Sequence, residues 1–428
     1  MSVTVVVGAQ WGDEAKGKIV DMLSENADLV ARYNGGDNAG HTVVNPYGTF
    51  KLRLIPNGFS NPHTACVIGP GVVLNLTTLL NEIETIESKG IDLVSRLWIS
   101  PRCHVIMPYH PRLEALYESA KGKGFTGSTG RGIGPVYADK VSYNGIRLAD
   151  LAAPPIFAEK LRIQLGLKNA LFEALGVEPL EFEAVYAEKL AQFERLRRVV
   201  REPFGLIQEM LVRNGVIVLE GAQGSLLDND WGTYPFCTAS TTIAGGAAAG
   251  LGIAPSWLKR IIGVAKAYTT RVGSGPMPTE LLDPTGEAIR EAGAEFGTVT
   301  GRPRRCGWFD AALVRFTAQL NGFTEIALTK LDVLDSLPKI KLCVGYRQGS
   351  EQALHQYWEG DAEWLATVEP EYIEMPGWQA STKGLRQFDQ LPKAAQAYVR
   401  KVEELVERRV SLVATGPGRS ETLEVPPG

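Results

Sequence analysis

A glycine-rich segment near the N-terminus has residue types that can bind phosphate. It follows the apolar run 4–7 and reads GDEAKGK over residues 12–18, which matches the GxxxxGK part of a phosphate-binding loop. Ile19 stands where Ser or Thr normally holds Mg²⁺, and Asp13 and Glu14 put carboxylates into the loop. A carboxylate beside phosphates is favourable if Mg²⁺ lies between them or if it takes a proton from a second substrate. A glycine-rich turn with a solvated charge pair fits the bare pattern equally well.

A second glycine-rich segment, residues 34–42, contains His41 among small and polar residues. A lone histidine is more often packed in a core or exposed than catalytic. This one is among only five in the chain, and its loop is too rich in glycine to form a core. If the two glycine-rich segments face each other, an Asp/His pair results.

The tetrad Thr329-Lys330-Leu331-Asp332 follows the apolar run 325–328 and has the form of the guanine-reading motif of GTPases. An ionised Asp accepts from both the ring N–H and the exocyclic amine of guanine, whereas adenine offers no such pair of donors. The lysine stem can cover the face of the base. A charged turn after a strand explains the tetrad alone, but a phosphate loop in the same chain favours GTP.

An arginine-rich loop, residues 296–308, carries Arg302, Arg304 and Arg305 between several glycines. Guanidinium groups bind carboxylates and phosphates through two parallel hydrogen bonds, so this loop is suited to close over a dicarboxylate. The alternatives are a solvated basic turn or an RNA contact. RNA is disfavoured because no aromatic or basic interleaving extends the patch and the net charge of the chain is -4.

The elements that must position these loops are predicted from the hydrophobic pattern. Short apolar runs rich in β-branched residues predict strands at 4–7, 65–68, 97–99, 216–219, 261–265 and 325–328. Continuous apolar strands between helical stretches favour an α/β fold with a large, mostly parallel central sheet flanked by helices, similar to phosphate-loop NTPases. Helical spacing is found at 156–213 and 396–408, and ligand-binding loops are expected at 122–134, 232–252 and 293–307. We expect a single domain over 1–428, with a helical subdomain at about 156–213.

The composition narrows the possible partners and location. With 428 residues, 44% of them hydrophobic, the chain can form a large core without metal or disulfide. The slightly acidic balance argues against nucleic-acid or membrane binding. Five scattered cysteines without CxxC spacing argue against a disulfide framework or a zinc site. Because no secretory leader or membrane-spanning stretch is recognisable, a cytoplasmic location is expected.

Taken together, these motifs resemble the adenylosuccinate synthetase family in order and spacing. The matching segments are 12–18, 34–42, 127–140, 220–238, 298–308, 329–332 and 415–419. The resemblance implies GTP-driven phosphorylation of the 6-oxygen of IMP, followed by displacement of the phosphate by the amine of L-aspartate, the first committed step of AMP synthesis. It also implies one Mg²⁺ per subunit and a homodimer in which the partner supplies an arginine to the nucleotide phosphate.

The same resemblance assigns roles to individual residues. Asp13 is expected to be the base that removes the ring proton, His41 to hydrogen-bond the transferring phosphoryl group and Lys16 to bind phosphates. Mg²⁺ is expected on Asp13 and the Gly40 carbonyl. The expected GTP-binding residues are Gly12, Asp13, Glu14, Ala15, Lys16, Gly17, Lys18, Gly40, His41, Thr42, Arg304, Lys330, Leu331, Asp332, Ala414, Thr415 and Gly416. Those expected for IMP are Asp13, Lys16, Asn38, Ala39, Gly40, His41, Thr129, Gln223, Thr238 and Arg302. Those expected for aspartate are Thr298, Val299, Thr300, Gly301, Arg302 and Arg304.

The chain departs from the family pattern at several positions around the nucleotide. Tyr143 stands where the family has the arginine supplied by the partner, and a lost charge-assisted contact of about 1.5–3 kcal/mol would weaken phosphate binding. The other departures are Ala15, Asp37, Arg53 and Trp231. They leave open a paralogue that runs the same chemistry on a different purine nucleotide. A GTP-binding regulatory protein is a more distant alternative, which would need switch-like loops.

Overall fold

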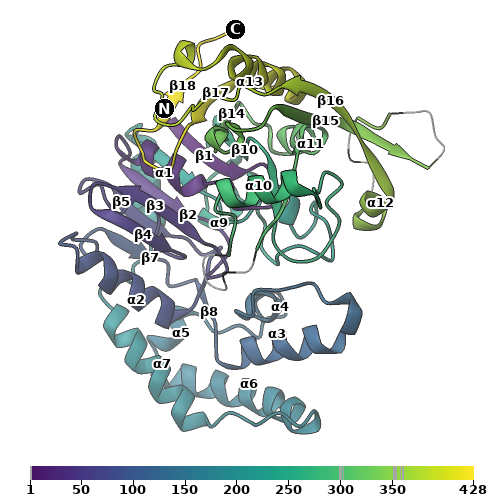
Figure 1. The fold of residues 1–428 in the computed structure, drawn as a ribbon. Coiled ribbons are helices and arrows are strands. Elements are labelled where there is room, and N and C mark those ends of the chain that lie inside the picture. Colours follow the sequence, from purple (N-terminus) through teal and green to yellow (C-terminus); the bar gives the residue numbers. More distant parts are fainter. Residues whose placement is uncertain (1, 298–300, 302, 350–353, 357, 359–360) are drawn as a thin grey trace.

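The centre of the fold is a nine-stranded sheet in the order β18-β17-β14-β10-β1-β9-β2-β5-β7 (Figure 1). The computed structural model describes residues 2–297, 301, 303–349, 354–356, 358 and 361–428. All neighbouring strands of the sheet are parallel except β17 and β18. The strands are β1 (Ser2–Gly8), β2 (Leu29–Arg32), β5 (Ala65–Ile68), β7 (Leu97–Ile99), β9 (Val216–Glu220), β10 (Arg260–Lys266), β14 (Glu325–Thr329), β17 (Val410–Ala414) and β18 (Thr422–Glu424). The predicted α/β class is confirmed, and each predicted strand lies in this sheet.

The sheet is buried on both faces, which explains why its strands are continuously apolar. In β1, Val5 and Val7 pack into one hydrophobic core and Val6 into another, because successive side chains point to opposite faces. Helix α1 (Lys16–Ser24) packs on the second face through Ile19 and Val20. The first face is covered by α8 (Phe204–Val212), α9 (Gly245–Leu251), α11 (Ala311–Asn321) and α13 (Lys393–Val406).

A group of helices extends the sheet beyond its β5–β7 edge. It consists of α2 (Leu76–Glu87), α5 (Leu148–Leu151), α6 (Pro154–Ala174) and α7 (Phe182–Leu196). Figure 1 shows these helices together, on the side of the molecule away from β17 and β18. Phe157 and Phe193 share a core with Ile68 and Ile99 of the sheet. The helices predicted at 156–213 are therefore present, and they pack on the sheet rather than forming a separate core. We call α2, α6 and α7 the helical layer.

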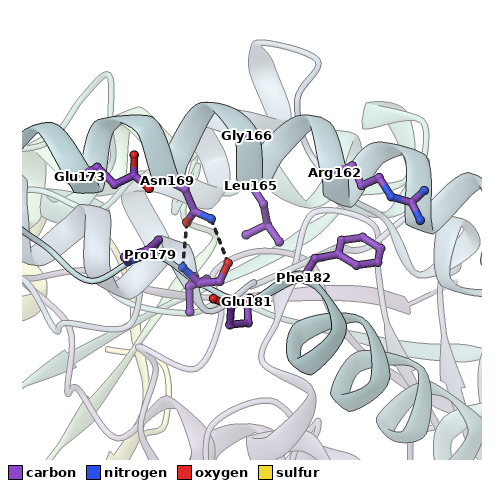
Figure 2. Close-up of a pocket in the computed structure, with 9 residues that line it drawn as sticks. Arg162, Leu165, Gly166, Asn169, Glu173, Pro179, Glu181 and Phe182 are labelled. Carbon is purple, nitrogen blue, oxygen red and sulfur yellow. Dashed lines mark hydrogen bonds between the residues drawn. The ribbon is translucent and has the colours of Figure 1, made fainter.

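A hollow of about 350 Å³ lies within the helical layer. Figure 2 shows it between α6 and the segment that leads into α7. Asn169 closes one end with a pair of hydrogen bonds to the backbone of Leu180, each 2.9 Å long. The guanidinium of Arg162 lies over the ring of Phe182. None of the predicted site residues lines this hollow, so its polar groups serve the packing of the helices.

The segment 232–252 differs from the loop that was predicted there, because it contains helix α9. Gly250 lies so close to the β2–β3 connection that a Cβ atom would stand 2.2 Å from the carbonyl oxygen of Tyr33. The glycines in this segment therefore permit close packing of a helix.

Smaller elements complete the chain. They are β3 (His41–Asn45), β4 (Gly48–Leu52), β6 (Val73–Leu74), β8 (His104–Val105), α3 (Tyr109–Ala120), α4 (Ile133–Val141), β11 (Thr269–Arg271), α10 (Pro284–Ala292), β12 (Arg305–Gly307), β13 (Phe309–Asp310), β15 (Lys339–Gln348), α12 (Ala362–Thr367) and β16 (Val368–Pro376). Within the described residues, the helices are all too short or too polar to cross a membrane.

Candidate active site

The carboxyl ends of the central strands bring together segments that are far apart in the sequence. β1 leads into the phosphate loop, β14 into the tetrad 329–332 and β17 into the turn 414–416. The Thr329 hydroxyl donates to the carbonyl oxygen of Glu14 at 2.8 Å. The phosphate loop and the tetrad are therefore in direct contact, at the edge where α/β sheets bind their ligands.

The two carboxylates of the phosphate loop have different surroundings. Glu14 is fully buried, and its Oε1 accepts from the backbone N–H groups of Gln10 and Gly12 at 3.1 and 2.8 Å. Its Oε2 pairs with Nζ of Lys16 at 2.6 Å. Asp13 keeps a side chain that is 29% exposed. Glu14 thus stabilises the loop from within, whereas Asp13 remains accessible to a substrate.

Ala15, one of the departures from the family pattern, begins helix α1 in a left-handed conformation with φ of 63°. Asp13 has a similar φ of 61°. Non-glycine residues occupy this region at a cost of roughly 1–2 kcal/mol. The alanine at position 15 therefore adds backbone strain to the phosphate loop.

His41 is buried at the start of β3, and its ring faces the phosphate loop. A Cβ atom on Gly17 would lie 3.2 Å from Cβ of His41, so the glycine of the GK pair leaves room for the histidine. Nδ1 of His41 lies 3.0 Å from both Oε1 of Glu220 and Nδ2 of Asn57. Burial, reinforced by Arg32 and Lys16, holds the pKa of His41 well below its usual value. The imidazole is therefore neutral at pH 7.

Three residues predicted to bind the purine nucleotide form one hydrogen-bonded network. Nε2 of Gln223 donates to Oδ1 of Asn38 at 2.9 Å, and Nδ2 of Asn38 donates to Thr238 at 3.2 Å. Thr129 lies outside this network, exposed in the loop between α3 and α4. Arg302 falls outside the described residues.

The predicted guanine site lies where α1, the tetrad and the turn 414–416 meet. Nζ of Lys18 donates to the carbonyl oxygens of Gly416 at 2.5 Å and Glu421 at 2.8 Å, so this lysine fixes the turn to α1. Burial lowers the pKa of Lys18 to about 8. Burial also raises the pKa of Asp332. Lys330 adopts a left-handed conformation with φ of 58°, which turns the chain after β14.

The arginine loop reaches the phosphate loop through one side chain. Nε of Arg304 lies 2.9 Å from Oδ2 of Asp13, and its Nη1 lies 2.8 Å from Oε2 of Glu295. Gly301 is exposed with φ of 63°. The predicted aspartate-binding residues Thr298, Val299, Thr300 and Arg302 fall outside the described residues.

Comparisons with known proteins agree with this geometry. The model of the adenylosuccinate synthetase family matches residues 5–423. The adenylosuccinate synthetase of Heliobacterium modesticaldum is 50% identical over 426 residues, which cover 99% of each chain. The chain belongs to the adenylosuccinate synthetase family. The fully ligated adenylosuccinate synthetase of Plasmodium falciparum matches with a TM-score of 0.94 at 35% identity, over 100% of both chains.

A more distant structure shares the fold alone. The succinoaminodeoxyadenylate synthetase of cyanophage S-2L matches with a TM-score of 0.61 at 22% identity, and the match covers 100% of this chain and 96% of that chain.

Membership of the adenylosuccinate synthetase family confirms the predicted reaction, a GTP-dependent and Mg²⁺-dependent C–N ligation of L-aspartate to IMP. A paralogue acting on another purine nucleotide is not favoured, because relatives at 46% and 50% identity are adenylosuccinate synthetases.

Two departures from the adenylosuccinate synthetase pattern are neighbours in space. Nη1 of Arg53 donates to the carbonyl oxygen of Asp37 at 3.0 Å. The Asp37 carboxylate is fully buried, accepts from Asn75 and Thr78 at 3.0 and 3.1 Å, and lies 3.7 Å from Arg131. Burial raises the pKa of this carboxyl, and the nearby arginines and donors oppose that rise.

The other departures lie on the surface. Tyr143 follows α4 and is 97% exposed, and Trp231 is exposed in the loop before Gly232. Neither aromatic ring blocks the site within this chain.

Several residues of the site were missed from the sequence. Glu220 and Asn57 hold His41, and Glu295 joins Arg304 to Lys330. Glu220 ends an otherwise apolar strand and begins the matching segment 220–238, but it was given no role.

Proposed function

We propose that this edge of the sheet binds all substrates of the ligation, with Asp13 as the general base. The observation that carries the proposal is the convergence of the phosphate loop, the tetrad and the Gln223–Asn38–Thr238 network at one end of the parallel strands. Asp13 belongs to the phosphate loop, and its carboxylate is partly exposed. A base must reach the proton that it removes, whereas Glu14 is buried among donors of its own loop.

The chemistry explains why both a base and a phosphate donor are needed. The 6-oxygen of a purine ring leaves poorly, so direct attack by an amine on the ring carbon is slow. Removal of the N1 proton by Asp13 increases the electron density on the 6-oxygen, which then attacks the γ-phosphorus of GTP. GDP leaves, and 6-phosphoryl-IMP forms. The amine of aspartate then displaces inorganic phosphate and gives adenylosuccinate.

His41 is proposed to donate a hydrogen bond to the transferring phosphoryl group. Nδ2 of Asn57 donates to Oε1 of Glu220 at 2.6 Å, and Nδ1 of His41 lies 3.0 Å from each of these two atoms. The proposed tautomer is the one in which Nδ1 accepts from Asn57 and the proton is on Nε2. Nε2 can then donate to an oxygen on which negative charge develops, which is where a fixed donor accelerates the reaction most.

Mg²⁺ is proposed to bind Asp13 and the Gly40 carbonyl together with phosphate oxygens. These ligands are hard oxygen donors of the kind that Mg²⁺ prefers, and Gly40 is exposed in a loop with no atom within 4 Å of the place of a Cβ. Among the described residues, no group of three or more acidic, histidine or cysteine side chains can hold a metal by itself. When bound, Mg²⁺ neutralises charge on the phosphates of GTP.

The remaining assignments follow from position. Lys330, Leu331, Asp332 and the turn 414–416 are proposed to bind guanine, and the loop 298–304 to close over aspartate. We also propose a homodimer, supported by the fully exposed Tyr143 at the position where the family uses a partner residue. A single domain is supported by the core shared between the sheet and the helical layer. A cytoplasmic location is supported by five free cysteines.

The proposal is tested by measuring phosphate release from GTP with aspartate, Mg²⁺ and one purine monophosphate at a time. We expect turnover with IMP and a product with the mass of adenylosuccinate. Omission of aspartate should abolish that product. Steady GTP hydrolysis without aspartate or IMP would contradict a site built for ligation and favour a regulatory GTPase.

A further inference from the structure

Glu295 is a buried carboxylate in the turn that follows α10, within the loop expected at 293–307 but not among the predicted site residues. Its Oε1 accepts from Nζ of Lys330 at 2.6 Å, Nζ of Lys266 at 2.8 Å and the hydroxyl of Tyr268 at 2.5 Å. Its Oε2 accepts from Nη1 of Arg304 at 2.8 Å. Oε1 therefore accepts from three donors and Oε2 from one, and three of these four donors are cationic.

The cations keep this carboxylate ionised. Burial alone would raise the pKa of Glu295, but Lys266, Lys330 and Arg304 hold it well below its usual value. Lys266 is as deeply buried as Glu295, with side chains 1% and 0% exposed. Burying these charges is costly unless each is paired with an opposite charge. The positions of Lys266, Lys330 and Arg304 therefore depend on the Glu295 carboxylate.

Two of the donors, Lys330 and Arg304, belong to different predicted binding subsites. Lys330 is the lysine of the guanine-reading tetrad, and its ammonium also donates to the carbonyl oxygen of Gly293 at 2.8 Å. Arg304 belongs to the arginine loop and contacts Asp13 on its other edge at 2.9 Å. The backbone N–H of Arg304 donates to the carbonyl oxygen of Glu295 at 2.9 Å. One carboxylate thus touches the guanine reader directly and reaches the proposed base through a single arginine.

We infer that Glu295 is a positioning residue that couples guanine recognition to the arginine beside Asp13. By holding the Lys330 ammonium, it keeps the lysine stem extended where guanine is proposed to bind. By holding the Arg304 guanidinium, it fixes the arginine that lies against Asp13 and is predicted to bind aspartate. The inference rests on the proposed function, because it assigns Glu295 a role between two of its binding subsites.

The variant Glu295→Gln tests the coupling, because it keeps the shape of the side chain and removes the charge. We expect the KM values for GTP and aspartate to rise together by about tenfold or more, the scale of a lost charge-assisted hydrogen bond. The KM for IMP should change less, because the Gln223–Asn38–Thr238 network does not contact Glu295. Preference for GTP over ATP should also fall.

Glu280→Gln is the matched control. Glu280 pairs with Arg305, the residue after Arg304 and the first of β12, at 2.8 Å, but no hydrogen bond or ion pair joins it to Lys330 or Arg304. We expect the KM values of Glu280→Gln for GTP, aspartate and IMP to match those of the native protein. An equal rise in the KM values of Glu295→Gln and Glu280→Gln would overturn the inference. Loss of any ion pair near the arginine loop would then be enough to raise KM.

A second variant keeps the test decisive if Glu295→Gln fails to fold with Lys266 left unpaired. The double variant Lys266→Met, Glu295→Gln removes both buried charges and should show the same joint rise in KM. In a double-mutant cycle, Lys330→Met combined with Glu295→Gln should raise the KM for GTP no further than either change alone. Additive effects, or unchanged KM values in a folded variant, would overturn the inference.

Failure of the inference is distinct from failure of the proposed function. Binding of a fluorescent GTP analogue to the native protein, with ATP and GTP as competitors, measures guanine preference without turnover. Equal competition would refute the proposed guanine site itself. Stronger competition by GTP, combined with normal KM values in folded Glu295→Gln, would refute only the role of Glu295.

Discussion

The buried carboxylates at the carboxyl edge of the central sheet contrast with the ion pair that joins α7 to α2 in the helical layer. At the sheet edge, Glu14, Glu220 and Glu295 are all fully buried, and each accepts several hydrogen bonds. In the helical layer, Arg195 of α7 pairs with Glu84 of α2 while their side chains remain 55% and 61% exposed. The three sheet-edge carboxylates are thus removed from water, whereas the pair between α2 and α7 stays in water. The helical layer also has a buried carboxylate, Glu82 of α2, which accepts from the backbone N–H groups of residues 53–55.

The comparison separates charges that shape the site from charges that cover the surface. Breaking a buried ion pair costs about 3–5 kcal/mol, whereas exposed pairs contribute about 0–1 kcal/mol. Buried charges are not required for stability as such, because well-packed apolar residues often replace them without loss. Their concentration at the sheet edge therefore indicates that they are kept for the geometry of the ligand site.

The largest expected effect is on turnover, from Asp13→Asn. Removal of a general base lowers the rate by roughly 10²- to 10⁴-fold. The side chain is partly exposed, so we expect the melting temperature to change little. Rapid-quench measurement of phosphoryl transfer, together with binding of a fluorescent GTP analogue, separates chemistry from affinity. Near-normal turnover would remove Asp13 from the role of base.

The second-largest effect is expected from Glu220→Ala, which should lower both kcat and the free energy of unfolding. This change leaves Arg32 buried without its nearest carboxylate, at 3.8 Å, and releases His41 and Asn57. We expect a loss of about 3 kcal/mol in the free energy of unfolding. We also expect a fall in kcat of up to about 100-fold, the scale of a catalytic group misplaced by 1 Å.

The role of Glu220 through His41 is checked by a double-mutant cycle. His41→Asn should lower kcat by itself, and Glu220→Ala should add little to that loss. Denaturant unfolding followed by circular dichroism gives the stability of each variant. Full additivity in kcat would show that Glu220 acts independently of His41.

A smaller effect is expected on specificity, from Asp332→Asn. An amide presents a donor as well as an acceptor, so it cannot accept from both the ring N–H and the amine of guanine. We expect the ratio of kcat/KM for GTP over ATP to fall by about tenfold or more. Measuring both nucleotides with the same IMP and aspartate concentrations gives this ratio directly. An unchanged ratio would place base selection elsewhere in the site.

The motifs at this edge were predictable because each is local in sequence. The phosphate loop, the tetrad 329–332 and the strands that precede them are signalled by a few adjacent residues. Strand β2 was missed because its short run Leu29–Arg32 follows α1 closely and ends in a charge that the fold buries. The glycines of α9 were interpreted as a loop because glycine is rare in helices, although here they permit contact with Tyr33.

The supporting carboxylates were not predictable, because their partners are distant along the chain. Glu220 and Asn57 are 163 residues apart, and Arg304 and Asp13 are also far apart in the sequence. The proximity of Asp37 to Arg131, 3.7 Å apart, could not be predicted either, since position 37 by itself reads as an isolated departure from the family pattern. Local patterns define the loops, but only tertiary packing defines which charges meet.

The smallest expected effect comes from the helical layer and uses the same chemical change as at Glu220. Glu84→Ala removes one partner of the exposed pair between α2 and α7. Because water solvates Arg195 whether or not Glu84 is present, we expect the free energy of unfolding to fall by less than about 1 kcal/mol, with kcat and KM unchanged. Denaturant unfolding of Glu84→Ala beside Glu220→Ala measures the contrast directly. A loss at Glu84 comparable with that at Glu220 would mean that burial does not distinguish the two regions, and the assignment of the buried charges to the site would lose its energetic basis.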